Sequence, residues 1–263
     1  MGIYVVTGGT KGIGEQTVNI LLNQGHEVIN IDIDGGDINA DLGTREGREF
    51  ALSEMWRRCP DGLDGLVCNH GIAGRLDKYK ASYVLSVNYF GALVIIEGLY
   101  DLLKMKRGNC AVTSSGSIAP TKRGKYYVDQ LLNNCGDEER IGRLVDTYDM
   151  MDAGHIVYVS TKIAIARFVR RAAPSFSAKG VNINAVAPGS VDTTILHGLG
   201  KPDERYFYYP IPAYYGQDKD LMDPYDVAQA LAFFASPAAN GVSGMVMLCD
   251  TGSASILDTD RYY

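Results

Sequence analysis

The sequence is poor in the residues that build metal sites, disulfide frameworks and nucleic-acid surfaces. It has four histidines and five cysteines, and the cysteines are widely spaced and never form a C-x-x-C pair. This pattern disfavours a zinc site and a disulfide framework, and it fits a reducing cytoplasm. Lys and Arg total 25 against 31 Asp and Glu, for a net charge of -6, whereas nucleic-acid binding needs clustered positive charge. We expect no metal and no nucleic-acid partner.

Long apolar runs are also missing. No continuous apolar stretch approaches the ~20 residues that cross a membrane. A strand predicted to begin at Ile3 leaves no room for a signal peptide. The chain has 263 residues, of which 46% are hydrophobic and 21% charged, and this is ample for one large core. We expect a cytoplasmic protein that does not bind a membrane.

Short apolar runs alternate with longer helical patterns along the chain. The predicted strands are Ile3–Thr7, Glu27–Asp32, Gly65–Cys68, Cys110–Ser114, Val181–Val186 and Met245–Leu248. The predicted helices are Ile13–Gln24, Glu46–Arg58, Val84–Lys104, Val159–Lys179 and Asp223–Phe234. The strands are apolar throughout instead of at every second residue, which is typical of a parallel sheet covered on both faces. The sequence therefore predicts one α/β domain, residues 1–263, built on a doubly wound parallel sheet.

Two segments interrupt this alternation. Residues 120–155 are polar, with apolar residues at helical spacing on both sides of Gly136, which predicts an inserted pair of helices before the next long helix. Residues 195–223 show little periodicity and are rich in aromatics, proline and glycine. That composition is typical of an ordered but mobile loop.

A glycine-rich turn, TGGTKGIG over Thr7–Gly14, joins the first predicted strand to the first predicted helix. Such a turn lets backbone N–H groups and the helix dipole approach a pyrophosphate without interfering Cβ atoms. An ordinary loop turn is the alternative, but an acidic residue about 20 residues further on favours dinucleotide binding. The candidate cofactor residues in this turn are Gly8, Thr10, Lys11, Gly12, Ile13 and Gly14.

The acidic residue is Asp32, at the end of the second predicted strand. Its carboxylate can accept hydrogen bonds from both ribose hydroxyls of NAD, whereas a 2′-phosphate there would meet like charge. Lys11 could instead reach a 2′-phosphate and permit NADP. Asp32 could also simply cap a loop. We expect NAD as the cofactor, with NADP as the alternative.

Tyr158 and Lys162 are four residues apart at the predicted start of a helix, which places them on one face. A tyrosine hydroxyl has a pKa of ~10, and lowering it to ~7 takes about 4 kcal/mol. One ammonium ~4 Å away in a partly dry cleft supplies that order of energy. The spacing alone also fits an ordinary amphipathic helix. Beside a glycine turn on the same sheet, it favours a tyrosine that acts as a general acid/base.

Together these motifs resemble the short-chain dehydrogenase/reductase family over essentially the whole chain. The resemblance rests on TGGTKGIG, Asn69-His70-Gly71, Asn88, the serines after the fourth predicted strand, the pair Tyr158 and Lys162, and Pro188-Gly189 followed by Thr193. The stretches DGLVCNHG, SVNYFGA and NAVAPG resemble one member group, the bacterial 3α-hydroxysteroid dehydrogenase/carbonyl reductases. The resemblance implies a single-domain Rossmann fold and an oxidoreductase that interconverts a secondary alcohol and a ketone.

The resemblance also implies a role for each matched residue. Tyr158 would be the general acid/base, and Lys162 would lower its pKa and bind the nicotinamide ribose. Ser115 would hydrogen-bond the substrate oxygen, and Asn88 would hold a water that connects Lys162 to solvent. The alternatives for the serine role are Ser114 and Ser117. The inserted helical pair separates Ser115 from Tyr158 and lies beside the family's usual oligomer interface, which it puts in doubt.

Further cofactor contacts are implied in the same way. Asn69 and Gly71 would pack against the adenosine ribose, and Asp41 and Leu42 would flank the adenine. Val191 and Thr193 would hold the carboxamide, and the cofactor site would also include Pro188 and Gly189. His70 stands where the family usually has alanine, and we expect it to be a packed loop residue rather than a catalyst.

The loop over residues 195–223 is the segment that closes over the substrate in the family. Its aromatic residues are Tyr206, Phe207, Tyr208, Tyr209, Tyr214 and Tyr215. Flat aromatic walls with hydroxyl tips suit a steroid or bile acid, and we favour the 3-hydroxy position. These side chains could instead pack against the insertion or a neighbouring subunit.

Two other functions stay open. The same chemistry could act on a small ketone, a sugar alcohol or a 3-oxoacyl substrate. A non-catalytic dinucleotide sensor is the alternative from a different class, although it would not need Tyr158, Lys162, Ser115 and Asn88. We expect a homodimer or homotetramer.

Overall fold

Seven parallel strands form the centre of the computed structural model, which describes residues 1–119, 128–148, 153–197 and 221–257. The strands are β1 (Ile3–Thr7), β2 (Glu27–Asp32), β3 (Ile38–Asn39), β4 (Gly65–Cys68), β5 (Asn109–Thr113), β6 (Asn182–Pro188) and β7 (Val246–Cys249). Their order across the sheet is β3-β2-β1-β4-β5-β6-β7. The chain runs outward from β1 in one direction and then from β4 in the other. Ligands of such sheets bind at the carboxyl ends of the strands, where this reversal occurs.

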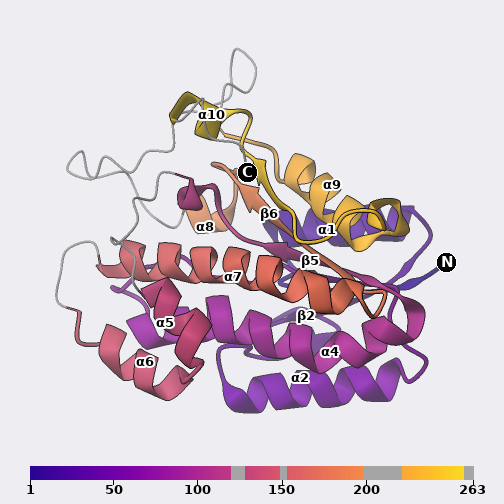
Figure 1. Ribbon diagram of the computed structural model, residues 1–263, viewed down its shortest axis with the longest axis horizontal. Coiled ribbons are helices and arrows are strands. Elements are labelled where there is room, and N and C mark those ends of the chain that lie inside the picture. The colour runs from indigo at the N-terminus through magenta and orange to yellow at the C-terminus, as the bar shows by residue number, and fades with distance from the viewer. Residues whose placement is uncertain (120–127, 149–152, 198–220, 258–263) are drawn as a thin grey trace.

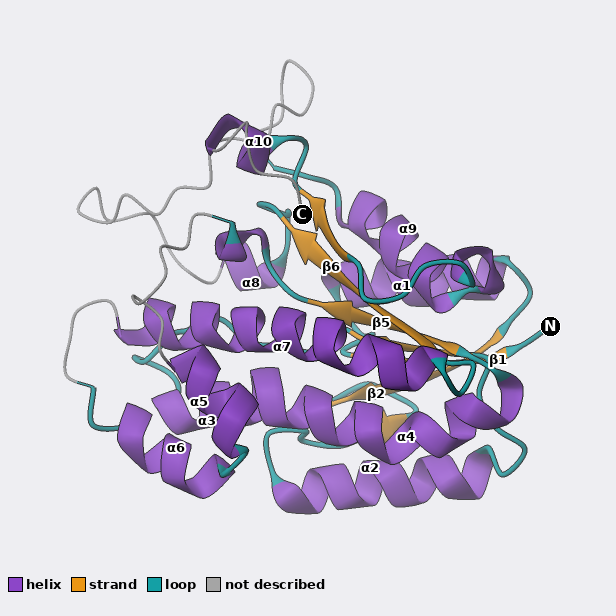
Figure 2. Cartoon of the chain, in the orientation of Figure 1, coloured by secondary structure: helices purple, strands orange, loops and turns teal. Residues whose placement is uncertain are grey.

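Helices cover both faces of the sheet. One layer holds α1 (Gly12–Asn23) and α9 (Pro224–Ala235), and the other holds α2 (Arg45–Arg58), α4 (Ala92–Lys106) and α7 (Ala153–Ser177). Figure 1 shows the two layers on opposite sides of the strands, and Figure 2 shows the strands between them. Val5 packs into the cluster under α2, α4 and α7, and its neighbours Tyr4 and Val6 pack into the cluster under α1 and α9. This double coverage explains the continuous apolar strands and confirms the predicted α/β class.

A long helical run from Ala81 to Lys106 lies between α2 and α7 in Figure 1. It consists of α3 (Ala81–Leu85), a π-helical turn (Ser86–Gly91) and α4, so the helix predicted over residues 84–104 is confirmed and contains a π-helical turn that was not predicted. By length and composition alone this run could cross a membrane, but 61% of its apolar window is buried inside the protein. Ile95 and Leu99 have no exposed surface. The run therefore serves as the core helix of its layer.

The predicted insertion is a pair of short helices, α5 (Val128–Cys135) and α6 (Glu138–Val145). Gly136 between them has a φ of 61°, which glycine adopts without strain. α5 packs against α7, and α6 packs against α3; Figure 1 shows α5 between α6 and α7. The remaining short elements are α8 (Thr194–His197), α10 (Ser253–Leu257) and two 3-10 turns, Gly116–Ile118 and Pro237–Ala239.

Most predicted boundaries lie within three residues of those in the structure, and two differences are larger. β3 was not predicted, because a two-residue strand produces no apolar run. α7 begins at Ala153 and not at the residues around Tyr158, so the tyrosine lies in its second turn. Gly154 and the β-branched residues that follow have weak helix propensity, but Val157 is fully buried in the core. Tertiary packing therefore extends the helix by more than a turn.

Candidate active site

The glycine-rich turn between β1 and α1 has the conformation that only glycine adopts easily. Gly8 and Gly12 have φ values of 68° and 59°. A Cβ on Gly14 would overlap the carbonyl oxygen of Gly8, so glycine is what lets α1 pack this closely on the end of β1. A tight turn, an open approach for a phosphate and close helix–strand packing are the three glycine roles of a dinucleotide-binding turn. The turn fits a pyrophosphate.

Side chains from the end of β2 fasten this turn. The Gly9 N–H donates to Asn30 Oδ1 at 2.9 Å, and the Thr10 N–H donates to Asp32 Oδ2 at 2.9 Å. The other oxygen of Asp32 accepts from the Ile33 N–H at 2.7 Å. Asp32 therefore does order its loop, and its carboxylate also stands at the strand end where a ribose would be bound. Lys11 is exposed on the same turn.

Asn69 connects three neighbouring strand ends. Its Nδ2 donates to the Gly8 carbonyl at 3.2 Å, and its Oδ1 accepts from Thr113 Oγ1 at 3.0 Å. Two residues further on, a Cβ on Gly71 would lie 3.2 Å from Asn88 Oδ1 and 3.5 Å from Lys162 Nζ. The structure therefore brings the predicted adenosine-side residues of this segment next to the predicted catalytic ones.

Asn88 lies in the π-helical turn and is 2% exposed. Its Oδ1 accepts from the Ile72 N–H at 2.8 Å and its Nδ2 donates to the Ile72 carbonyl at 2.9 Å. The side chain thus pairs with the backbone as another strand would. It holds residues 71–72 in place beside Lys162.

Lys162 is buried in α7 with its ammonium directed at the end of β5. Its Nζ donates to the Thr113 carbonyl at 3.1 Å and lies 5.8 Å from the centre of the Tyr158 ring. Ser114 Oγ donates to the Lys162 carbonyl at 2.9 Å. The helix and the strand end are therefore joined twice, through the lysine side chain and through its backbone.

The three candidate serines have different partners. Ser115 Oγ accepts from Ser117 Oγ at 2.9 Å and from the Ser117 N–H at 3.2 Å. The Ser115 side chain also lies close enough to the Tyr158 hydroxyl to act on its pKa. Ser114, as described above, bonds to the backbone of α7. Ser115 is accordingly the serine that lies with the tyrosine hydroxyl.

The pKa of Tyr158 moves in the opposite direction to the prediction. Burial raises the pKa of Tyr158, and the Ser115 side chain opposes this only in part. Burial also lowers the pKa of Lys162 to about 8. The physical reason is that the ammonium is directed at the Thr113 carbonyl and desolvation dominates for both groups. In the chain by itself, Tyr158 is therefore a protonated acid at neutral pH.

The predicted adenine side is ordered by its own hydrogen bonds. Asp41 accepts from the Gly43 N–H at 2.8 Å and from the Tyr83 hydroxyl at 3.1 Å. Burial, together with the Asp41 charge, raises the pKa of Tyr83 to about 12, so the tyrosine remains a donor. The Leu42 side chain is buried in the core, and the Leu42 carbonyl accepts from Arg48 Nε at 2.7 Å.

The predicted carboxamide side lies at the end of β6. Pro188 ends the strand, and the Gly189 N–H donates to the Cys249 carbonyl at 2.9 Å. A Cβ on Gly12 would lie 3.2 Å from Thr193 Cγ2, so Thr193 lies over the glycine-rich turn. Val191 pairs with Met222 in an isolated parallel bridge.

Sequence reasoning missed the participation of Thr7, Thr113 and Arg48, whose contacts depend on the fold. The ring of His70 places Nδ1 2.7 Å from Thr7 Oγ1, and burial lowers the pKa of His70 to about 4. His70 is therefore a neutral, packed residue in the structure. The unusual histidine in the N-H-G motif was the one sequence signal that could have pointed to its contact with Thr7.

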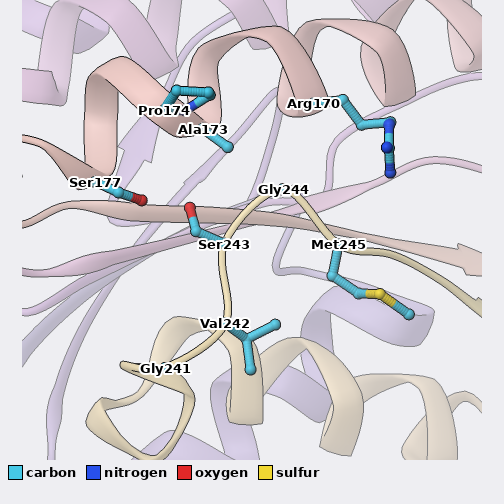
Figure 3. Close-up of a pocket in the computed structure, with 9 residues that line it drawn as sticks. All are labelled: Arg170, Ala173, Pro174, Ser177, Gly241, Val242, Ser243, Gly244 and Met245. Carbon is cyan, nitrogen blue, oxygen red and sulfur yellow. The ribbon is translucent and has the colours of Figure 1, made fainter.

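The aromatic residues of the predicted substrate loop, Tyr206, Phe207, Tyr208, Tyr209, Tyr214 and Tyr215, lie outside the described residues. A cavity of about 490 Å³ lies elsewhere, between the last part of α7 and residues 241–245 (Figure 3). Its lining includes Arg170, Pro174 and Ser243 but none of the predicted site residues. Within the described ranges, no group of three or more His, Cys, Asp or Glu could hold a metal ion.

Known proteins resemble this chain in both sequence and fold. Residues 144–254 match the family described as Enoyl-(Acyl carrier protein) reductase. The chain is 31% identical over 262 residues to the 3-alpha-hydroxysteroid dehydrogenase/carbonyl reductase of Comamonas testosteroni, with 100% of both covered. It is 26% identical to a 3-oxoacyl-acyl-carrier-protein reductase of Vibrio harveyi, over 95% of this chain and 96% of the relative.

The crystal structure of the 3-alpha-hydroxysteroid dehydrogenase from Pseudomonas sp. B-0831, complexed with NADH, matches this fold with a TM-score of 0.87. Its sequence is 31% identical, and the match covers 99% of this chain and 100% of that chain. The parallel sheet, the glycine-rich turn and the full-length identity agree. This chain belongs to the short-chain dehydrogenase/reductase family of nicotinamide-dependent oxidoreductases.

Proposed function

We propose that this protein is an NAD-dependent dehydrogenase that interconverts a secondary alcohol and a ketone on a hydroxysteroid or bile acid, with the 3-hydroxy position favoured. The observation that carries the chemistry is that the Ser115 side chain lies close enough to the Tyr158 hydroxyl to lower its pKa, beside the buried Lys162. These groups lie at the same strand ends as the glycine-rich turn. In this proposal Tyr158 is the proton donor, Ser115 binds the substrate oxygen and Lys162 supplies the nearby positive charge.

Each residue of this group has a distinct part in the reaction. In ketone reduction the Tyr158 hydroxyl gives its proton to the substrate oxygen, and in alcohol oxidation it takes the proton back. Ser115 donates a hydrogen bond to the same oxygen as its negative charge develops. The Lys162 ammonium stabilises the tyrosinate that proton donation leaves behind. Asn88 keeps residues 71–72 against the lysine and, in our proposal, orders a water on its path to solvent.

The cofactor site consists of the residues around the glycine-rich turn. A bound nicotinamide dinucleotide supplies the hydride acceptor for oxidation and the hydride donor for reduction. Asp32 would bind the adenosine ribose, Asp41 and the backbone of Leu42 would flank the adenine, and Thr193 would hold the carboxamide. The Asp32 carboxylate favours NAD because a 2′-phosphate in its place would meet like charge.

The steroid assignment is supported by the Comamonas relative, named for 3-alpha-hydroxysteroids, which matches over the full length at 31% identity. A 3-oxoacyl thioester is the second candidate, because the Vibrio relative is named for such a substrate at 26% identity. The net charge of -6 disfavours docking of an acidic carrier protein. We also propose a cytoplasmic homodimer or homotetramer, which light scattering of the purified protein would test.

The substrate proposal is tested by following nicotinamide absorbance with 3-, 7-, 12- and 17-hydroxysteroids, each with NAD and with NADP. Matched 3-oxoacyl thioesters and small ketones form the comparison set. We expect the highest kcat/KM for a 3-hydroxysteroid with NAD. Turnover of the thioesters with no response to any steroid would move the assignment to the second candidate.

A further inference from the structure

Arg48 is a buried arginine in a helix whose other charged residues are mostly exposed. The residue is 4% exposed, although it lies in the first turn of α2. Its Nε donates to the Leu42 carbonyl at 2.7 Å, and its Nη2 donates to the Ser86 carbonyl at 3.1 Å. The same Nη2 lies 3.4 Å from the Gly43 carbonyl. The guanidinium therefore joins residues 42–43 to the first residue of the π-helical turn.

Glu138, in the first turn of α6, completes the partners of this guanidinium. Arg48 Nη1 and Nη2 donate to the two carboxylate oxygens of Glu138, each at 2.7 Å. Burial acts to raise the pKa of Glu138, but hydrogen bonds from Arg48 and Ser86 outweigh it and hold the pKa below its usual value. Parallel bonds of this kind fix direction as well as distance, which a lysine ammonium cannot do.

The segments that meet at this ion pair all border the proposed site. Leu42 and Gly43 follow Asp41, which is proposed to flank the adenine. Ser86 is two residues before Asn88, which holds residues 71–72 against Lys162. Glu138 belongs to the inserted helical pair, which has no other assigned role. The Arg48 side chain is 5% exposed and the Glu138 side chain 37% exposed, so the insertion reaches the adenine side and the catalytic side through one partly buried contact.

We propose that Arg48 and Glu138 are positioning residues through which the helical insertion holds the adenine-side residues 41–43 and the π-helical turn that carries Asn88. This inference rests on the proposed function, which assigns cofactor binding to residues 41–43 and a catalytic role to Asn88 in the π-helical turn. Removing the carboxylate leaves the buried guanidinium without its counter-charge, which is unfavourable even though water reaches the Glu138 side of the pair. The arginine then moves, and the carbonyls that it holds at residues 42 and 86 move with it.

The insertion offers two matched controls. Asp129 in α5 is buried and pairs with Arg167 in α7, so Asp129→Asn loosens the insertion at a contact that touches neither segment. Glu139 is the neighbour of Glu138 and forms a largely exposed pair with Arg143. Glu139→Gln therefore removes the same charge from the same helix turn without breaking the contact between Arg48 and Glu138.

The experiment compares Glu138→Gln with both controls, using hydrogen exchange of the protein without cofactor and calorimetric binding of NAD. We expect Glu138→Gln to speed the exchange of amides in residues 41–47 and 86–91. We also expect it to raise the Kd for NAD by roughly fivefold or more, a usual size for coupling between sites. Both controls should keep the Kd within about twofold of the parent protein, the scale of a surface change.

Conservative variants keep the inference falsifiable if Glu138→Gln does not fold. Glu138→Asp retains the charge and should recover part of the NAD affinity, and Arg48→Lys should behave like Glu138→Gln. Unchanged exchange and an unchanged Kd in these variants would overturn the inference, as would an equal loss in Asp129→Asn. If the parent protein does not bind NAD, the proposed function fails, and the exchange data alone decide the role of Arg48 and Glu138.

Discussion

The glycine-rich turn and the catalytic cluster are adjacent but are built in different ways. The turn depends on backbone conformation at Gly8, Gly12 and Gly14 and on side chains from the end of β2. The cluster depends on buried polar side chains from distant segments, such as the bond from Lys162 to Thr113, which are 49 residues apart. A local structure can be predicted from a local pattern. The electrostatics of an assembled cluster cannot.

The comparison of the turn with the cluster also predicts which variants lose folding stability and which lose catalytic activity. A change in the turn disturbs the packing of α1 on β1 and therefore both folding and cofactor binding. A change at Lys162 removes a buried cation. Burial of this cation lowers its pKa, so its charge costs stability instead of adding to it. We therefore expect losses of stability in the turn and losses of activity alone in the cluster.

The largest effect is expected for Gly14→Ala. The added Cβ would overlap the carbonyl oxygen of Gly8, and neither backbone can move without displacing α1. We expect a loss of about 3 kcal/mol in the free energy of unfolding, measured by urea denaturation, and no measurable NAD binding. Gly241→Ala is the control, since a Cβ there meets nothing within 4 Å. Normal NAD binding by Gly14→Ala would show that the turn is not the cofactor site.

Lys162→Met should reduce kcat/KM by about 100-fold or more, the usual loss for one electrostatic group. Because the folded protein holds this lysine at a pKa of about 8, below its unfolded value, the charged form costs stability below that pH. The free energy of unfolding at pH 7 should therefore not fall. A loss of stability as large as in Gly14→Ala would remove the distinction between turn and cluster.

The pH profile sharpens the assignment of Lys162. Its lowered pKa means that the ammonium is present below about pH 8 and is lost above it, whereas burial keeps Tyr158 protonated through the neutral range. We expect kcat/KM for NADH in ketone reduction to be flat near pH 7 and to decline by about tenfold per unit above pH 8. A flat profile to pH 10 would contradict this.

The smallest effect is expected for Asp32→Ala. The change removes the carboxylate that accepts the Thr10 N–H and the repulsion toward a 2′-phosphate. We expect the ratio of kcat/KM for NAD over NADP to fall about tenfold, in line with one charged hydrogen bond. Asp34→Ala, at an exposed neighbouring position, should leave the ratio unchanged. An unchanged ratio in Asp32→Ala would show that another group determines the preference for NAD over NADP.

The parts of the fold that could be predicted are those with a dense local signal. Strands such as β1 are apolar on both faces, as Val5 and Val6 show, and Gly136 divides the inserted helices. β3 is too short to give a signal, and the start of α7 depends on the burial of Val157 instead of on propensity.

Residue types in the site could be predicted for the same reason, because Tyr158 and Lys162 share one helix face. The direction of the Tyr158 pKa could not, since it depends on how deeply the side chain is buried and on where the lysine points. The role of Arg48 was also hidden. A single arginine in a charged helix carries no sign that it meets Glu138 from 90 residues away.

The central claim is that Tyr158 transfers the proton and does not hold the cofactor site together. Its most direct test is Tyr158→Phe, measured for turnover of a 3-hydroxysteroid with NAD and for calorimetric binding of NADH. The phenyl ring keeps the packing of α7 and removes only the hydroxyl. We predict a loss of about 1,000-fold in kcat with a Kd for NADH within about twofold of the parent protein. Turnover within tenfold of the parent protein would contradict the account.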